Sequence, residues 1–337
     1  MTAASPDFPA DFPAGAPADF SAGAPADFPA DALVIRARPG SLGLAGEARE
    51  LWRYRHLVRT LVERDLRVRY KNSVLGVAWT MVNPLVQVFV LTIAISYILG
   101  AGPKNLSAFI FCASVPWTFF QTAVLDSSTS VLAKLGLLKK VYFPREIPLI
   151  ATVCQNFVQF LVSLGVFVLY RFVLTPLLHG GNVAPPLALL WLPVVVAILF
   201  LLTLGTAFFV ATLNVFYEDV KFILNLTMGF LFYLMPIIYF AENIVLSARI
   251  PTLFFFHQSL AWWVYHTYLI NPLAWIITAF KQMFFGIQII TKPGDKAFPS
   301  APFDWHYLLI TAATSTAICL SGYAFFNSRK WKFTERS

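Results

Sequence analysis

Charge is scarce in this sequence. Only 12% of its 337 residues are Asp, Glu, Lys or Arg, whereas 58% are hydrophobic, and ordinary soluble domains carry roughly 25% charged residues. Several stretches of 20 or more residues hold no charge at all, and a helix of about 20 apolar residues spans a bilayer. This balance excludes a soluble protein. It predicts a polytopic membrane protein with no room for a large catalytic domain outside the membrane.

Signatures of catalysis and nucleotide binding are also missing. No GxxxxGK[ST], HExxH or GxSxG motif occurs, so we expect no P-loop, zinc-protease or serine-hydrolase chemistry in this chain. The three cysteines, Cys112, Cys154 and Cys319, fall in apolar stretches and form no CxxC or CxxxC pair. We expect small core residues there, without disulfide or metal. The sequence therefore predicts no catalytic residue, no metal site and no cofactor bound by this chain.

The first 45 residues have a composition of their own. Pro, Ala and Asp dominate them, and the hexapeptide GAPADF occurs at 15–20 and again at 23–28. Such a segment cannot bury enough apolar surface to order itself. We therefore predict a disordered tail over residues 1–45.

Uncharged runs predict six membrane-spanning helices. The first follows Lys71 and is interrupted by Asn83 and Pro84. The other five are placed at 105–125, 147–170, 191–216, 222–241 and 305–328. The uncharged stretch 250–280 contains two prolines and two histidines, so we assign it to broken or re-entrant helices within an outer segment, 242–300. The predicted fold class is all-α.

The basic residues predict the orientation of these spans. From residue 46 onward, and with six spans, 17 Lys and Arg residues fall on the side of both termini and six fall on the other. The positive-inside rule then places both termini in the cytoplasm. A seventh span would separate the basic C-terminus from the basic N-terminal segment, which argues against it.

Residues 46–73 predict an amphipathic helix at the membrane interface. At 100° per residue its apolar side chains share one arc and most of its cations share a neighbouring one. Arg55 and Arg69 fall on the apolar side, where each has to snorkel or meet an anionic partner. Two interpretations stay open: the helix anchors the chain to anionic lipid, or its cations also meet an anionic lipid head group that enters a transport path. The apolar arc comprises Leu51, Tyr54, Leu57, Val58, Leu61, Val62 and Val68.

Three further groups of residues bear on function. The loop 133–146 has more aromatic content than a topology signal needs, so we favour contact with a cytoplasmic partner over a plain positive loop. The acids Glu218 and Asp219 lie beside Lys221, which favours a charge-paired turn over a proton relay. Most rings in the spans should pack or face lipid, and the hypothesis for a minority is that they line a conduit for sugars. The candidates for that conduit are Trp117, Phe119, Phe120, Phe232, Tyr233 and Tyr239.

Five motifs occur in a recognisable order. They are RDLRVRYKNSVLGVAW (64–79), LLKKVYFPREI (137–147), NVFYEDVKFIL (214–224), MPIIY (235–239) and NPLAW (271–275). From about residue 50 onward the sequence resembles type-2 ABC exporter permeases, and most closely the polysaccharide branch that serves O-antigen, capsule and teichoic acid. The chain departs from that pattern at Glu218, where the family usually has Arg, and at Lys281, where Arg is common. The tail has no counterpart in it.

The resemblance implies a homodimer of six-span subunits in the bacterial inner membrane, with the transmembrane domain at 74–337. A separate homodimeric ATPase would hold ATP and Mg, and the cargo would be a polyprenyl-diphosphate-linked glycan; no nucleic acid is implied. The residues implied for a gate helix that meets the substrate head group are Arg64, Asp65, Arg67, Arg69, Tyr70 and Lys71. Those implied for coupling to the ATPase are Lys139, Lys140, Tyr142, Phe143, Pro144, Arg145 and Glu146. A type-2 permease for drugs or other lipids is the alternative, and a membrane glycosyl transferase is a more distant one.

Overall fold

The structure is a computed structural model in which residues 1–47 and 48–337 form two units, and every residue described belongs to the second. The described residues are 52–74, 76, 79–98, 100, 106–134, 144–174, 176–177, 186–239, 241, 254–255, 258–285, 303–330 and 332. The predicted tail, 1–45, and residues 135–143 of the predicted coupling loop lie outside these ranges.

Nearly all regular structure in the described residues is helical. The one pair of strands among them is a short antiparallel hairpin of β1 (Phe254–Phe255) and β2 (Gln258–Ser259). In chain order the helices are α2 (Arg55–Arg69), α3 (Trp79–Thr92) with the π-helix η2 (Ile93–Ile98), α4 (Leu106–Ala133), α6 (Ile147–Leu169) with the π-helix η3 (Tyr170–Leu174), the 3-10 helix η4 (Leu187–Trp191), α8 (Leu192–Phe216), α9 (Val220–Leu234), α11 (Leu260–Ile270), α12 (Pro272–Phe285) and α13 (Trp305–Arg329).

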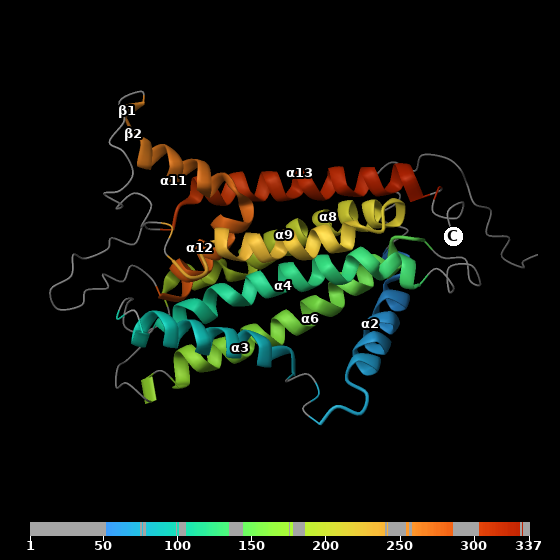
Figure 1. Cartoon of the computed structure of the whole chain (residues 1–337). Helices are drawn as coiled ribbons and strands as arrows, with labels where there is room; N and C mark the ends of the chain where they lie inside the picture. The colour runs from blue at the N-terminus through green and yellow to red at the C-terminus, as the bar shows by residue number, and fades with distance from the viewer. Residues whose placement is uncertain are drawn as a thin grey trace, which may run out of the picture. The chain divides into compact units, whose positions relative to one another are not determined.

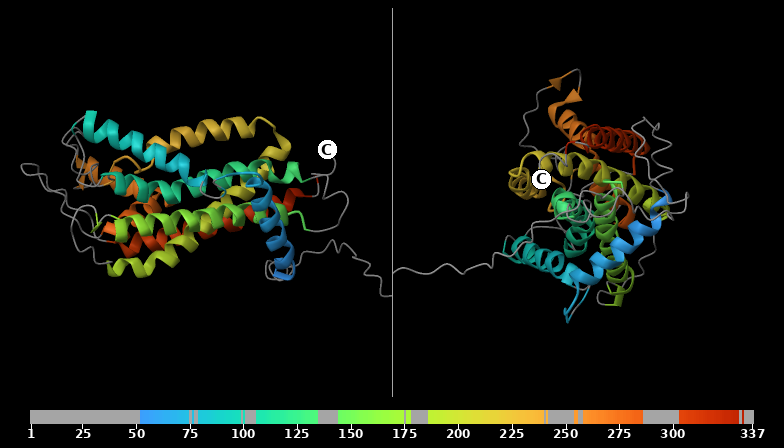
Figure 2. Two further views of the ribbon diagram at one scale, coloured as in Figure 1. Left: turned by 90° about the horizontal axis from the view of Figure 1, so that it is seen from below. Right: turned by 90° about the vertical axis from the view of Figure 1, so that its right-hand side faces the viewer.

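The long helices lie alongside one another, and different elements gather at their two ends (Figure 1). At one end α2 runs across the bundle; we call this the α2 end (Figure 2). The hairpin, α11 and α12 gather at the opposite end, here called the α11 end. There Trp191 and Trp305, at the starts of α8 and α13, pack edge to face with ring centroids 4.3 Å apart.

Five stretches of helix are long and apolar enough to cross a membrane, so the chain is a polytopic membrane protein. They cover 81–98, 106–133, 147–174, 187–216 and 305–329. The fifth predicted span in chain order, 222–241, is not one helix. It holds most of α9, whose 15 residues rise about 22 Å, followed by a bent segment. Helix α9 ends at Leu234 because Pro236 disfavours helical backbone at Met235, which is extended with ψ of 151°.

The uncharged stretch 250–280 holds α11, of 11 residues, and the start of α12, of 14 residues. Both helices are too short to span about 30 Å of hydrocarbon. They are separated at Asn271, whose side-chain Oδ1 accepts a hydrogen bond from the Leu273 N–H, and Pro272 begins α12 because its ring suits the first helical position. The expectation of short, broken helices here is therefore met.

Helix α4 lies at the centre of the core. It packs against α3, α6, α8, α9 and α12, and most of its side chains are buried from Leu106 to Val131. On another side of the core α8 and α13 approach so closely that a Cβ added to Gly205 would stand 2.6 Å from the Cα of Cys319. Small residues permit such close helix contact inside membranes, where lipid offers no hydrophobic driving force for association.

Candidate functional site

The apolar face of α2 packs on the start of α6. Leu61 is 4% exposed and lies against Ile147 and Ala151, which are fully buried, with Tyr54, Leu57, Val58 and Val62 around them. The 100° periodicity predicted this face. Val68 is the exception, since it was expected on the apolar side and is 67% exposed. Protein contacts therefore fix α2 across the end of the bundle (Figure 1).

Arg69, at the end of α2, joins a polar cluster with side chains of α4 and α6. Its Nη2 donates to Oδ2 of Asp126 in α4 at 2.6 Å, and its Nη1 donates to Oε1 of Gln159 in α6 at 3.3 Å. Nδ2 of Asn156, one turn before Gln159, donates to the same Asp126 oxygen at 3.1 Å. The expectation that Arg69 meets an anionic partner is thus confirmed. Arg55, the other cation on the apolar side, stays local and hydrogen-bonds to the carbonyl of Trp52 at 3.3 Å.

A second contact joins α2 to the end of α4. Oδ2 of Asp65 accepts a hydrogen bond from Nζ of Lys134 at 2.6 Å, and its Oδ1 accepts from the neighbouring Arg64 at 2.8 Å. Burial by itself raises the pKa of the Asp65 carboxyl, but the hydrogen bonds and charges of Lys134 and Arg64 outweigh burial, so the pKa lies below its ordinary value. Lys134 is the last described residue before the loop 135–143.

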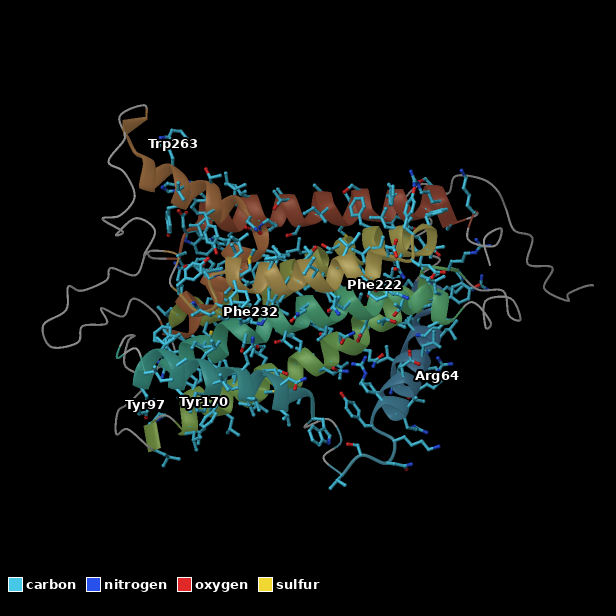
Figure 3. The ribbon with its side chains drawn as sticks, viewed as in Figure 1. Arg64, Tyr97, Tyr170, Phe222, Phe232 and Trp263 are labelled. Atoms are coloured by element: carbon cyan, nitrogen blue, oxygen red, sulfur yellow. The ribbon has the colours of Figure 1, made fainter. Side chains whose placement is uncertain are left out.

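Two other cations of α2, Arg64 and Arg67, are exposed, as is Lys71 in the turn that follows the helix. Figure 3 shows Arg64 directed away from the bundle. Tyr70 is half-buried and its hydroxyl has no hydrogen-bond partner in the described structure. Of the six residues predicted for a gate helix, Asp65 and Arg69 therefore hold α2 in place, while Arg64, Arg67 and Lys71 present an open basic face.

The end of the predicted coupling loop is tied to the end of α13. Oε1 of Glu146, which is 3% exposed, accepts a hydrogen bond from Nζ of Lys330 at 2.7 Å, and the Arg145 guanidinium donates to the Lys330 carbonyl oxygen. Pro144 is half-buried. The other predicted coupling residues, Lys139, Lys140, Tyr142 and Phe143, lie outside the described residues.

The predicted conduit rings are mostly packed within the subunit. Trp117 packs edge to face on Phe232, with centroids 6.0 Å apart, and Phe119 contacts Phe157 and Phe160 of α6. Trp117, Phe119, Phe120 and Phe232 are all buried, Tyr239 is half-buried, and Tyr233 is 70% exposed. A role in a conduit stays a prediction for these residues.

The turn before α9 differs from its prediction. Glu218 and Asp219 are exposed and take part in no ion pair within the described structure. Lys221, expected to pair with them, instead has its Nζ 5.0 Å from the centroid of the Phe222 ring. Ion pairs between solvent-exposed side chains contribute little to stability.

Sequence reasoning missed a buried cation in α12. Lys281 is 6% exposed, and its Nζ donates to the carbonyl oxygens of Pro236 at 2.5 Å and Tyr239 at 2.9 Å. These carbonyls belong to the bend after α9, where no continuing helix supplies N–H groups to bond them. The sequence signal for this contact was a single lysine in an apolar stretch, together with the proline in MPIIY. Asn156 and Gln159, three residues apart in an uncharged span, gave a similar signal for the Asp126 cluster.

Comparison with known proteins bears on the identity of this chain. No family model matches it. The O-antigen export system permease protein RfbA of Klebsiella pneumoniae is 26% identical over 280 residues, which cover 83% of this chain and 94% of the relative. The protein of the same name from Myxococcus xanthus is 26% identical over 288 residues, or 85% of this chain and 97% of the relative. The chain is a distant homologue of O-antigen export permeases.

For this permease homologue, the similarity extends over nearly the whole length of each relative. A shared domain inside an otherwise different protein would give partial coverage of the relatives. The comparison therefore concerns the membrane-spanning body as a whole.

Proposed function

We propose that this chain is the membrane permease of an ABC polysaccharide exporter. The observation that carries the proposal is the similarity to O-antigen export permeases over 94% to 97% of their length, in a chain with five candidate membrane spans. The permease itself is not catalytic. ATP and Mg bind to a separate ATPase subunit, and two copies of this chain assemble with two copies of that subunit.

The cargo is a polyprenyl-diphosphate-linked glycan. Its diphosphate carries several negative charges, which suit multidentate contacts with arginine at a partly dry surface. The exposed face of α2 and the turn after it offer such contacts through Arg64, Arg67 and Lys71, while Asp65 and Arg69 keep the helix at the bundle end. On this basis α2 admits the head group of the lipid-linked glycan.

The loop that ends at Glu146 carries the coupling to the ATPase. Through Lys330 and Ile147 it contacts α13 and the apolar face of α2. A movement of this loop is therefore transmitted to α2, the helix that we assign to substrate entry. Replacing Tyr142 and Phe143 by Ala should leave insertion intact but weaken ATPase binding or uncouple hydrolysis from export; unchanged complex formation and export would reduce the loop to a topology signal.

We assign six crossings to the subunit, with both termini in the cytoplasm of a bacterium and the α11 end outside. Helix α9 provides the fifth crossing together with the bend after Leu234, and α11 and α12 form a re-entrant pair. Single cysteines at positions 41, 180, 300 and 337, in a background without Cys112, Cys154 and Cys319, test this. Impermeant label from outside should reach positions 180 and 300 only, and labelling of position 337 would overturn the assignment.

The function is tested by deleting the gene and analysing surface polysaccharide together with polyprenyl-linked glycan retained inside the cell. Loss of surface glycan with retention inside is expected. Complementation with Arg64→Lys and Arg67→Lys together keeps the charge of α2 but loses the guanidinium forks, and should restore export only partly. Arg59→Lys, at an exposed site paired with Glu63, is the matched control. Normal surface glycan after deletion would remove the polysaccharide proposal and leave a drug or another lipid as the cargo.

A further inference from the structure

Arg171 lies at the α11 end, far from the basic face of α2. It belongs to η3, which continues α6, and follows Ile147 by 24 residues. At 1.5 Å per residue this separation is about 36 Å, which takes Arg171 from one bilayer surface to the head-group region of the other. Figure 3 shows the neighbouring Tyr170 at the opposite end of the bundle from Arg64.

In the part of the chain that the structure describes, the Arg171 side chain is buried without an anionic partner. The residue is 4% exposed, and none of the ion pairs formed by described residues includes it. Its Nε is buried and has no hydrogen-bond partner among the described residues. Aromatic rings lie beside it instead: the guanidinium carbon is 4.7 Å from the centroid of Phe285 and 5.9 Å from that of Phe172.

Ring faces alone do not satisfy a buried guanidinium. They attract its charge through the π-electrons, but they accept no conventional hydrogen bonds from its N–H groups. A buried cation left in this condition is costly, because neither water nor a counter-charge replaces its lost hydration. The unused N–H edge is planar and matches two oxygens of a carboxylate or phosphate group.

A second cation lies on the same side of α12 as the Phe285 ring. Lys281 is one helical turn before Phe285, so the two side chains share a face of the helix. Its Nζ donates to the carbonyls of the bend after α9, which orient its ammonium group. At this end of the bundle the one described acid is Asp304, which hydrogen-bonds to His306. Among the described residues, this end of the bundle therefore holds two buried cations, Arg171 and Lys281.

We propose that Arg171 binds the phosphate group of a lipid at the membrane surface of the α11 end. Phosphate is the abundant anion at the depth where Arg171 lies, and the guanidinium edge recognises its paired oxygens. The π-helical turn of η3 is consistent with such a site, since insertions of this kind occur often at functional positions. Two lipids carry this group: a membrane phospholipid and a polyprenyl phosphate carrier, of which the second rests on the proposed function.

A role in packing alone makes the opposite prediction. If the guanidinium served only to fill space between Phe285 and Phe172, then Arg171→Met, which keeps length and apolar contact, would remove an uncompensated charge. Such a change is often neutral or stabilising. If Arg171 holds a phosphate, the same change removes a binding site and the stability that the lipid confers.

The test uses the purified full chain in detergent. Native mass spectrometry and thermal unfolding are recorded with phosphatidylglycerol, with a polyprenyl phosphate and with uncharged diacylglycerol. Wild type is compared with Arg171→Met, Arg171→Lys and the control Arg59→Met, which removes the same charge from a side chain that is 79% exposed. Loss of the guanidinium contacts should weaken retention of the phosphate-bearing lipid about tenfold in Arg171→Met, with a smaller loss in Arg171→Lys and none in the control.

The two lipids separate the two sources. A defect in Arg171→Met with phosphatidylglycerol identifies a phospholipid site, which would stand even if the chain exports no glycan. A defect with the polyprenyl phosphate alone identifies the carrier and ties the site to export. Equal retention of both lipids by wild type and Arg171→Met, without a loss of lipid-dependent stability, would overturn the proposal.

Discussion

Arg69 at the end of α2 and Asp126 within α4 form an ion pair with Nη2 and Oδ2 2.6 Å apart. The pair is shared with Asn156 and Gln159 of α6. Helix α2 cannot move away from the bundle at this end unless these charges separate. The same helix is held one turn earlier by Asp65 and Lys134. Its position therefore depends on polar contacts with α4 and the residue after it, as well as on its apolar face.

We expect the Arg69–Asp126 pair to position α2 for substrate entry. Arg69→Met and Asp126→Asn should each reduce export and lower stability. Since both side chains are over a third exposed, at 37% and 34%, the coupling free energy should be about 1 kcal/mol. Thermal unfolding of the two single variants and the double variant measures this coupling. Additive effects on both stability and export would show that the pair does not act as a unit.

The Asp65 carboxyl should make stability depend on pH. Its pKa is lower in the folded protein than the ordinary value of 3.8. The pair with Lys134 and Arg64 therefore contributes stability that is fully present above the ordinary pKa and is lost as pH falls through the folded pKa. Asp65→Asn should lower the melting temperature near pH 7, and its deficit relative to wild type should shrink below pH 3.8. A deficit of the same size at both pH values would contradict this assignment.

The sequence predicted most of α2 and little of its attachment. A 100° periodicity reports which side chains share a face, so the packing of Leu61 was foreseeable. Because Arg69 lies on that apolar face, the sequence predicted an anionic partner for it. The identity of that partner, 57 residues away, depends on tertiary structure. The predicted span ended at residue 125, just before Asp126, whereas α4 continues seven residues beyond Asp126 to Ala133.

Hydropathy predicted the positions of the apolar segments in the chain better than it predicted their shape. The run 222–241 is uncharged throughout, but composition does not show where a helix ends. Pro236 ends α9 at Leu234, and the freed carbonyls require a donor that only the fold supplies, in Lys281. The sequence likewise shows that Trp117 and Phe119 are aromatic, but it does not show their burial, which depends on neighbours in α9 and α6.

The contact between α8 and α13 should tolerate no side chain at Gly205. An added Cβ would stand 2.6 Å from backbone atoms of Cys319, and backbone cannot rotate away as a flexible side chain can. Gly205→Leu should therefore force the helices apart and destabilise the protein by about 3 kcal/mol or more. Gly165→Ala in α6 is the control, because its Cβ would meet nothing within 4 Å. Equal melting temperatures for the Gly205 variant and wild type in detergent would refute the close contact.

Lys281 should be required for the bend that follows α9. Its ammonium group donates to the carbonyls of Pro236 and Tyr239, while the Leu234 carbonyl is satisfied separately by the hydroxyl of Tyr268 at 2.8 Å. Lys281→Met leaves the first two acceptors buried and without this donor, so we expect a loss of about 1–3 kcal/mol.

Arginine also presents several N–H donors, so Lys281→Arg should retain most of the stability if its longer side chain fits. Lys221→Met, at the exposed start of α9, controls for the loss of one positive charge. Thermal unfolding in detergent compares the three variants, and accessibility of a cysteine placed at Ile238 reports the bend. If Lys281→Met unfolds at the wild-type temperature and protects that cysteine equally, the bend holds without its donor and α9 is stopped by Pro236 alone.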